Sequence, residues 1–337
     1  MSQQNTSKQF LLNIAALIII IAGIKIASAL LIPFLLAIFI TIICAPIMLW
    51  LQQFKVPQGL AVLIVFALFI LIGMTFGSVI SQSITEFYEN LPEYNEKLQS
   101  LQAGLLNQLT SFGIPLDVQA LKTHLNPAKA MGMVSSLFTS LGSMLTNTFL
   151  ILFFVLFILM EVAGLPNKLI NAFGENTKSI TKFQQFSHSV KKYLVIKTLV
   201  SIGTGITVYI SLIIIGVDYP VLWALMAFLL NFIPNIGSII AAIPPLLLAL
   251  VQFGPAEALA VALIFVAINT IFGNIVEPKV MGKTLGLSSF IVFTSLVFWG
   301  WVLGPVGMLL SIPLTMVFKI ALENNGEYHW IAVLLDR

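Results

Sequence analysis

The apolar residues of this chain are gathered into long runs instead of a short alternating pattern. A helix needs about 20 apolar residues to cross the hydrocarbon core of a bilayer, and most of the runs approach or exceed that length. The pattern predicts an all-α integral membrane protein. The runs cover residues 10–32, 34–51, 60–79, 144–160, 193–215, 222–251, 258–272 and 290–321.

Two of the longest runs are broken near their middle. Asn231, Pro234, Asn235 and Gly237 interrupt the run 222–251, and the sequence GPVG at 304–307 interrupts the run 290–321. A proline inside a helix costs about 3 kcal/mol, and in hydrocarbon the freed backbone groups find no water. Broken backbone at membrane depth is tolerated where protein or a water-filled cavity covers it, so the breaks indicate a path for a solute.

The lysines set the predicted orientation. Residues 164–192 hold five lysines and one glutamate, whereas residues 81–143 hold five acidic residues and three lysines. Loops on the cytoplasmic side of a membrane are enriched in basic residues. We therefore expect residues 164–192 and the N-terminus to be cytoplasmic and residues 81–143 to be extracytoplasmic.

The same rule favours hairpins for the two broken runs. Lys279, Lys283 and Lys319 all become cytoplasmic if each broken run enters the membrane and returns on the same side. The prediction is six transmembrane helices plus two opposed re-entrant helical hairpins, with both termini cytoplasmic. Eight plain spans remain the alternative. The expected segments are 1–80 (transmembrane helices 1–3), 81–143 (amphipathic helical segment), 144–163 (transmembrane helix 4), 164–192 (basic loop), 193–322 (core with the two interrupted runs) and 323–337 (tail).

Residues 81–143 contain an apolar seam. Its members are spaced alternately three and four residues apart, as in a coiled coil or a packed amphipathic helix. Pro92 lies within the seam and is expected to kink the helix or divide it, and a shorter helix is predicted at 117–125. The segment is either a cap on its own membrane domain or a contact between subunits. The seam consists of Ile84, Phe87, Leu91, Tyr94, Leu98, Leu101 and Leu105.

Composition excludes several classes of protein. The 337 residues are 59% hydrophobic and 9% charged, whereas a soluble domain carries about 25% charged residues. The net charge of +3 is too small and scattered for nucleic-acid binding, and the single cysteine, Cys44, allows no intrachain disulfide. The first run is too long and leads too directly into the second for a cleaved signal peptide.

Catalytic and metal-binding patterns are not found in the sequence. The three histidines lie in separate polar segments without cysteine or carboxylate partners at metal spacing. No phosphate-binding loop and no paired nucleophile and base occur. The sequence therefore predicts a protein that is not an enzyme and that uses no metal or cofactor.

Small polar residues in apolar surroundings are the candidate path. Amides both donate and accept hydrogen bonds, which suits a neutral polyhydroxyl solute, although hydrogen bonding between helices is the plainer interpretation of any single one. Glu277 could carry a coupling proton or cation, or it could pair with Lys279 or Lys283 at the interface. The polar set is Asn231, Asn235, Ser238, Asn269, Thr270 and Asn274.

Five motifs resemble those of the autoinducer-2 exporter (AI-2E) family. They are NLPEY at 90–94, NFIPNIGS at 231–238, AIPP at 242–245, NIVEPKVMGKTLGL at 274–287 and GPVGMLLSIP at 304–313. The resemblance implies a bacterial inner-membrane secondary transporter that forms homo-oligomers, expected to be pentamers. Asn235, where family members often have an aromatic residue or glycine, and Lys25, within the first run, depart from the pattern. The family positions that match here are Pro234, Gly237, Pro244, Glu277, Pro278, Gly282 and Gly286.

The resemblance leaves the substrate open. The first hypothesis is export of a small polar organic solute such as the quorum-sensing signal autoinducer-2 through the breaks at 231–237 and 269–277. The alternatives are a monovalent cation (sodium or lithium)/proton antiporter in which Glu277 titrates, and a non-transporting membrane scaffold. The expected partners are the lipid bilayer, further copies of the chain, and a small-molecule or ionic substrate.

Overall fold

The computed structural model describes residues 18–111, 148–162, 178–234, 236–281 and 287–323, and in addition residues 12, 15, 16, 132, 164, 168, 171 and 335. These residues are almost entirely helical and include no β-strand, which confirms the all-α class. Five of the described helices are long and apolar enough to cross a membrane. They lie at Ser28–Gln53, Gln58–Leu101, Ser187–Ile215, Pro255–Met281 and Phe290–Leu309.

The chain divides into two compact units. The first comprises Met1–Ala67, Phe149–Val195 and Lys283–Arg337, and the second comprises Leu68–Thr148 and Ile196–Gly282. Helices α3 (Gln58–Ser111) and α8 (Lys178–Ile215) each contribute residues to both units. The polar residues predicted to line the path, from Asn231 to Glu277, lie in the second unit.

In the first unit, α2 (Ser28–Gln53) corrects the predicted joint between the first two apolar runs. The helix continues through Pro33, and the turn lies earlier, at Ala27. The Phe34 ring meets the ring of Phe154 in α6 (Thr148–Val162) edge-on, with centroids 5.5 Å apart. Pro33 is the sixth residue of α2 and lies beyond its first turn, and α2 also passes through Pro46, so neither proline ends the helix although each lacks the backbone N–H of a helical hydrogen bond.

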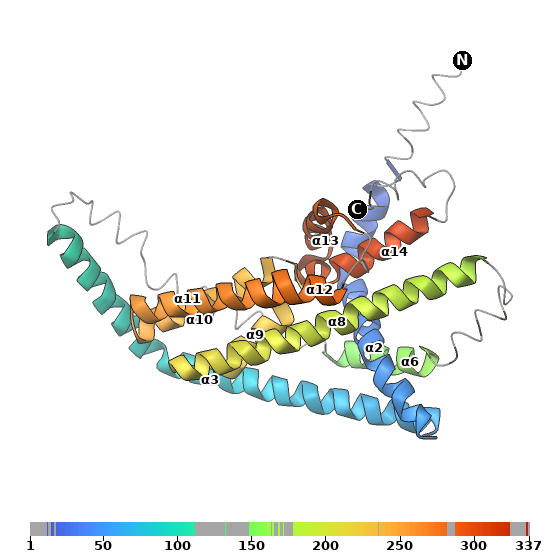
Figure 1. The fold of residues 1–337 in the computed structure, drawn as a ribbon, viewed down its shortest axis with the longest axis horizontal. Helices are drawn as coiled ribbons and strands as arrows, with labels where there is room; N and C mark the ends of the chain where they lie inside the picture. Colours follow the sequence, from blue (N-terminus) through green and yellow to red (C-terminus); the bar gives the residue numbers. More distant parts are fainter. Residues whose placement is uncertain are drawn as a thin grey trace, which may run out of the picture. The chain divides into compact units, whose positions relative to one another are not determined.

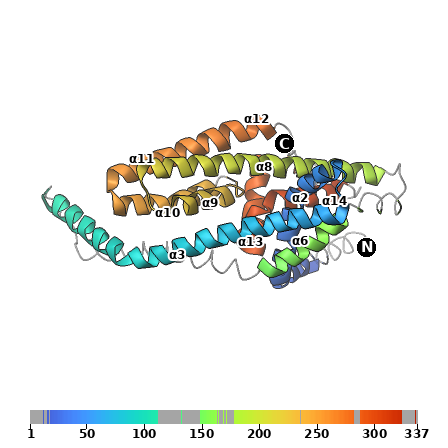
Figure 2. The ribbon, with the colours of Figure 1, turned by 90° about the horizontal axis from the view of Figure 1, so that it is seen from below.

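Helix α3 corrects a second predicted boundary. Its 54 residues correspond to about 80 Å of helix, so the apolar run 60–79 and the amphipathic segment after Ser81 form one continuous element. The helix passes through Pro92 and bends towards its C-terminal end (Figure 2). Five of the seven seam residues pack on the core of their own unit: Phe87 and Tyr94 are buried, and Ile84, Leu91 and Leu98 pack against the same core. This packing favours the cap over the subunit contact.

The predicted basic loop at 164–192 is partly helical, and the helix predicted at 117–125 is not described by the structure. The basic segment 164–192 is not a loop throughout, because α8 begins at Lys178 and continues to Ile215, the predicted end of the fifth run. The short helix predicted at 117–125 lies outside the described residues.

The second unit holds the first broken run as two helices, α9 (Pro220–Leu230) and α10 (Ile236–Gln252). They are followed by α11 (Pro255–Ile268), the π-helix η2 (Asn269–Val276) and α12 (Glu277–Met281). Figures 1 and 2 show α9 to α12 alongside the C-terminal half of α8. Their shared apolar core includes Trp223, Leu222, Leu212, Leu248 and Val261.

Helices α9 and α10 form a hairpin, as predicted for the first broken run. At its base, the Asp218 backbone N–H donates to Gln252 Oε1 at 3.2 Å, and Gln252 Nε2 donates to Asp218 Oδ2. At its tip, Asn231 Nδ2 donates to Ser201 Oγ at 2.9 Å. Ser201 lies about 21 Å along α8 from Ile215, the end of α8 near the base. A single crossing helix could not join residues 218 and 252, so the plain-span alternative is wrong for this run.

In the first unit, α13 (Ser289–Leu309) and α14 (Ser311–Glu323) form the second broken run. Gly304 interrupts α13 with φ 66° and ψ −152°, within the predicted break. Trp299 Nε1 donates to Thr315 Oγ1 at 3.1 Å. Sixteen residues of straight helix would span about 24 Å, so the chain folds back between these two side chains.

Candidate functional site

The clearest charged feature of the second unit is an ion pair between a buried lysine and a half-buried glutamate. Lys197 Nζ lies 2.8 Å from Glu277 Oε1 and 2.7 Å from Oε2, so the ammonium contacts both carboxylate oxygens. Lys197 is 3% exposed, and it enters from α8, whereas Glu277 begins α12. Removing a charge from water costs several kcal/mol, which an uncompensated lysine or glutamate could not recover here. The two residues therefore depend on one another.

The π-helix η2, which directly precedes Glu277, carries three polar residues, Asn269, Thr270 and Asn274. Its hydrogen bonds span five residues, a rare geometry that is often found at functional sites. A Cβ at Gly273 would lie 3.0 Å from the Asn269 amide oxygen, so a side chain at 273 would press on that amide. Glycine at this position leaves room for Asn269 to point inward.

Asn231 and Gly237 shape the tip of the first hairpin. Asn231 is buried, and its amide is held by Ser201. A Cβ on Gly237 would overlap the Leu230 carbonyl oxygen and touch the Ile233 side chain. The tight return of the chain requires glycine for lack of space, not for an unusual φ angle.

These elements enclose a polar cavity of about 60 Å³. The volume is enough for a few water molecules. The charged and amide groups come from α8, the hairpin tip, η2 and α12, which are distant in sequence. The lining consists of Lys197, Asn231, Ile233, Pro234, Ser238, Asn269, Gly273, Asn274 and Glu277.

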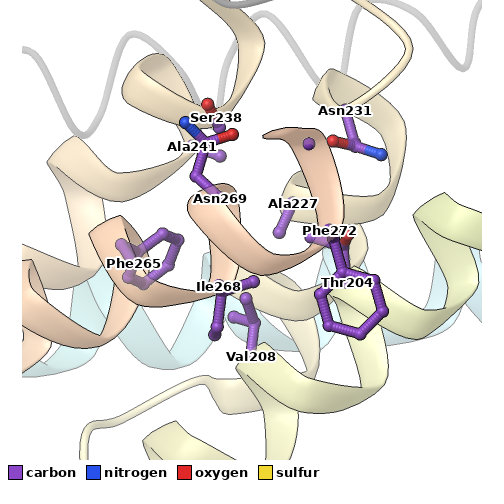
Figure 3. A pocket seen from close by; sticks show the side chains of 11 residues that line it. Thr204, Val208, Ala227, Asn231, Ser238, Ala241, Phe265, Ile268, Asn269 and Phe272 are labelled. Atoms are coloured by element: carbon purple, nitrogen blue, oxygen red, sulfur yellow. The ribbon is translucent and has the colours of Figure 1, made fainter. Parts of the chain in front are cut away.

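A narrower space of about 10 Å³ adjoins the polar cavity and shares Asn231, Ser238, Asn269 and Gly273 with it. Figure 3 shows the Asn269 and Ser238 side chains pointing toward one another at one side of this space, and Phe265 and Ile268 at the other. Most of its remaining lining is apolar. The Phe272 ring fills a notch on α8, since a Cβ at Gly203 would lie 2.7 Å from that ring. The polar cavity thus narrows into an apolar constriction.

A separate polar cluster closes the base of the hairpin. Tyr94 Oη donates to Asp218 Oδ2 at 2.7 Å and lies 3.2 Å from Tyr219 Oη, to which Asn90 Nδ2 donates at 3.0 Å. Tyr219 has a left-handed backbone with φ 59°, which costs a non-glycine residue about 1–2 kcal/mol. The hydrogen bonds from α3 hold this strained residue at the start of α9.

The structure brings together most, but not all, of the predicted path residues. Asn231, Pro234, Asn269, Asn274 and Glu277 line the cavity, and Gly237 is buried beside it. Pro244 is buried within α10 but outside the lining, and Pro278 is exposed. Thr270 is exposed and donates to the Val266 carbonyl. Asn235, Gly282 and Gly286 lie outside the described residues.

Of the alternatives for Glu277, pairing with Lys279 is wrong. Glu277 pairs with Lys197 and not with Lys279, which is exposed, while Lys283 lies outside the described residues. Lys197 was missed as a site residue, although a lone lysine within the apolar run 193–215 was the available signal. In the described ranges, no group of three or more His, Cys, Asp or Glu residues could hold a metal.

Comparison with known proteins gives matches along nearly the whole chain. The AI-2 transport protein TqsA of Escherichia coli is 40% identical over 97% of this chain and 95% of its own length. A putative transport protein of Haemophilus influenzae is also 40% identical, over 96% of this chain and 95% of its own length.

A more distant relative is the sodium-lithium/proton antiporter of Halobacillus andaensis, 25% identical over 96% of this chain and 97% of its own length. The family described as AI-2E family transporter matches residues 14–325. The protein is therefore a multi-pass membrane transporter that belongs to the AI-2E family.

Proposed function

We propose that the chain is a secondary transporter that exports a small polar organic solute, with autoinducer-2 as the leading candidate, across the inner membrane of a bacterial cell. The observation that carries the proposal is the polar cavity between the hairpin tip and η2. The 40% identity to a protein named as an AI-2 transport protein supports the choice of solute.

The chemistry of the lining suits an uncharged solute with hydroxyl groups. Asn231, Asn269 and Asn274 offer amide donors and acceptors. Sites for small organic ligands usually measure about 300–1,000 Å³, so the 60 Å³ cavity corresponds to a closed path that widens during transport. The Asn231–Ser201 hydrogen bond joins the hairpin tip to α8, and its breakage is part of that widening.

The proposed orientation follows the lysine distribution. Six crossings and two opposed re-entrant hairpins place both termini in the cytoplasm and residues 81–143 outside. Cysteines at Gln102, Lys182 and Lys283 in a Cys44→Ser background test this. Reagents that cannot cross the membrane should label only position 102 from outside; external labelling of position 283 contradicts the arrangement.

Homo-oligomers, with the pentamer as the leading state, belong to the same proposal and rest on the family resemblance. The mass of the detergent-solubilised protein measures the number of copies. A monomer at all protein concentrations contradicts this part of the proposal and leaves the path through a single chain in place.

Flux through the cavity is tested in reconstituted vesicles. We expect release of autoinducer-2 that falls at least about tenfold in Asn269→Leu, since an apolar side chain removes the amide from the lining. Thr270→Val is the matched control, because Thr270 neighbours Asn269 but lies outside the lining, and its hydroxyl donates to the Val266 carbonyl one turn earlier. Equal flux in vesicles without protein, or an equal fall in both variants, contradicts the proposed path.

A monovalent cation/proton antiporter is the second candidate. It is favoured by the Glu277 carboxylate at the cavity and by the antiporter named among the relatives. Proton movement driven by a sodium or lithium gradient, and lost in Glu277→Gln, would support it. Autoinducer-2 release without such proton movement would favour the organic solute.

A further inference from the structure

The polar cavity contains a complete pair of opposite charges. Among its described lining residues, Lys197 and Glu277 are the ionisable ones, and the remaining polar groups are amides and a hydroxyl. The lining therefore has no net charge when both residues are ionised. A site built to bind a bare cation would be expected to keep an excess of negative charge.

The position of the ammonium matters as much as its charge. Lys197 Nζ contacts both oxygens of Glu277, at 2.8 and 2.7 Å, and thereby occupies the place that a cation bound by that carboxylate would take. The ammonium is attached to α8, so it competes for the carboxylate as an intramolecular ligand at a high effective concentration.

Displacing the lysine would be costly for a free cation. The side chain of Lys197 is 4% exposed and that of Glu277 is 18% exposed. A sodium ion that took over the carboxylate would leave the ammonium buried without a partner, in addition to losing its own hydration shell. A neutral solute can bind the amides while the pair stays intact.

We infer that Lys197 is a built-in counter-ion that keeps monovalent cations away from Glu277 and so makes the cavity selective for uncharged polar solutes. This inference rests on the proposed function in that it assigns the class of substrate to the same cavity. It makes Lys197 a specificity-determining residue. It also predicts that the cavity becomes a sodium or lithium site when the lysine is removed.

Thermal melting of the detergent-solubilised protein in NaCl, LiCl and choline chloride at equal ionic strength tests the inference. The wild-type melting temperature should be the same in the three salts. Lys197→Met should melt lower in choline chloride and regain at least about 3 °C in NaCl or LiCl, because the cation now compensates Glu277. In Lys197→Met/Glu277→Gln, which has neither charge, this salt specificity should disappear.

Two results would overturn the inference. One is a higher melting temperature in NaCl than in choline chloride for the wild type but not for the double variant, since sodium would then bind with Lys197 in place. The other is a folded Lys197→Met whose melting does not distinguish sodium or lithium from choline. Lys197→Gln, which keeps a polar side chain, replaces Lys197→Met if the latter does not fold.

If neither single variant folds, binding of radioactive sodium to the wild type and to the double variant decides. Sodium bound by the wild type alone overturns the inference, and sodium bound by neither upholds it. The proposed function fails separately: absence of autoinducer-2 flux would overturn the proposed solute, whereas the cation measurements above concern Glu277 and Lys197 only.

Discussion

The two broken runs use the same backbone device and surround it with different chemistry. In the first hairpin a Cβ on Gly237 would overlap the Leu230 carbonyl oxygen, and in the second a Cβ on Gly307 would overlap the Trp299 carbonyl oxygen. Each glycine thus allows the chain to return closely past the backbone of the segment that precedes the break. In both hairpins, this requirement concerns space and is independent of the side chains that face the site.

Polar groups distinguish the two hairpins. The tip of the first is tethered to α8 through Asn231 and Ser201 and borders the Lys197–Glu277 pair. The legs of the second are joined by Trp299 and Thr315, and the buried Ser311 hydroxyl at the start of α14 has no hydrogen-bond partner among the residues that the structure describes. Glycines therefore explain why both runs fold back, whereas the polar lining explains why the first hairpin is the better candidate for the site.

The ion pair should give the largest effect. Lys197→Met leaves the half-buried Glu277 uncompensated, which should destabilise the protein by about 3 kcal/mol. Lys197→Met/Glu277→Gln should recover much of that loss because no charge remains buried. Chemical or thermal unfolding in detergent measures both.

The exposed pair Glu93–Lys97 of α3, with an N–O distance of 2.8 Å, is the matched control for the buried pair. Lys97→Met should change stability by less than about 0.5 kcal/mol, because exposed ion pairs contribute little. Equal losses at positions 97 and 197 would show that the Lys197–Glu277 pair beside the first hairpin stabilises the protein no more than an exposed pair does.

The glycines should give the next largest effect, and they test whether the hairpins are equivalent. Gly237→Ala and Gly307→Ala should each cost about 1–3 kcal/mol or prevent folding, because the new methyl meets backbone that cannot rotate away. Gly73→Ala in α3 is the control: a Cβ there meets no atom of the described residues within 4 Å, and alanine is more favourable than glycine in a helix by about 1 kcal/mol. A loss of stability at only one of the two glycine positions would show that the two hairpins are not equivalent.

The Asn231–Ser201 and Trp299–Thr315 hydrogen bonds should each affect only their own hairpin. Asn231→Ala leaves the Ser201 hydroxyl buried without its partner and should cost about 1–3 kcal/mol, whereas Trp299→Phe loses the bond to Thr315 and should cost about 1 kcal/mol. Hydrogen exchange followed by mass spectrometry should show faster exchange in residues 220–252 for the first variant and in residues 289–323 for the second. Faster exchange in both regions for either variant would mean that the hairpins do not respond independently.

The base of the first hairpin should give the smallest effect. Tyr94→Phe removes the hydroxyl that contacts Asp218 and Tyr219 but retains the buried ring, so a loss of about 1 kcal/mol is expected. The melting temperature should fall by about 2–4 °C. Tyr88→Phe, on the exposed side of the same helix, should leave the melting temperature unchanged.

The sequence alone was sufficient for the features that depend on local composition. Long apolar runs require helices in a membrane, because only internally hydrogen-bonded elements are stable there. The breaks at Asn231–Gly237 and at Gly304 could also be read from the sequence, because glycine and proline weaken helices wherever they occur. The amides that line the cavity could be selected because polar groups are costly in apolar runs.

Tertiary structure decided the features that depend on which segments meet. The sequence offered Lys279 or Lys283 as possible partners of Glu277, but the fold brings Glu277 to Lys197, eighty residues away. It also continues α3 past the predicted boundary and covers the α3 seam with the unit's own core. Periodicity identifies an apolar face but not its partner, and charge identifies the need for a counter-ion but not its source, because both are determined by packing between distant helices.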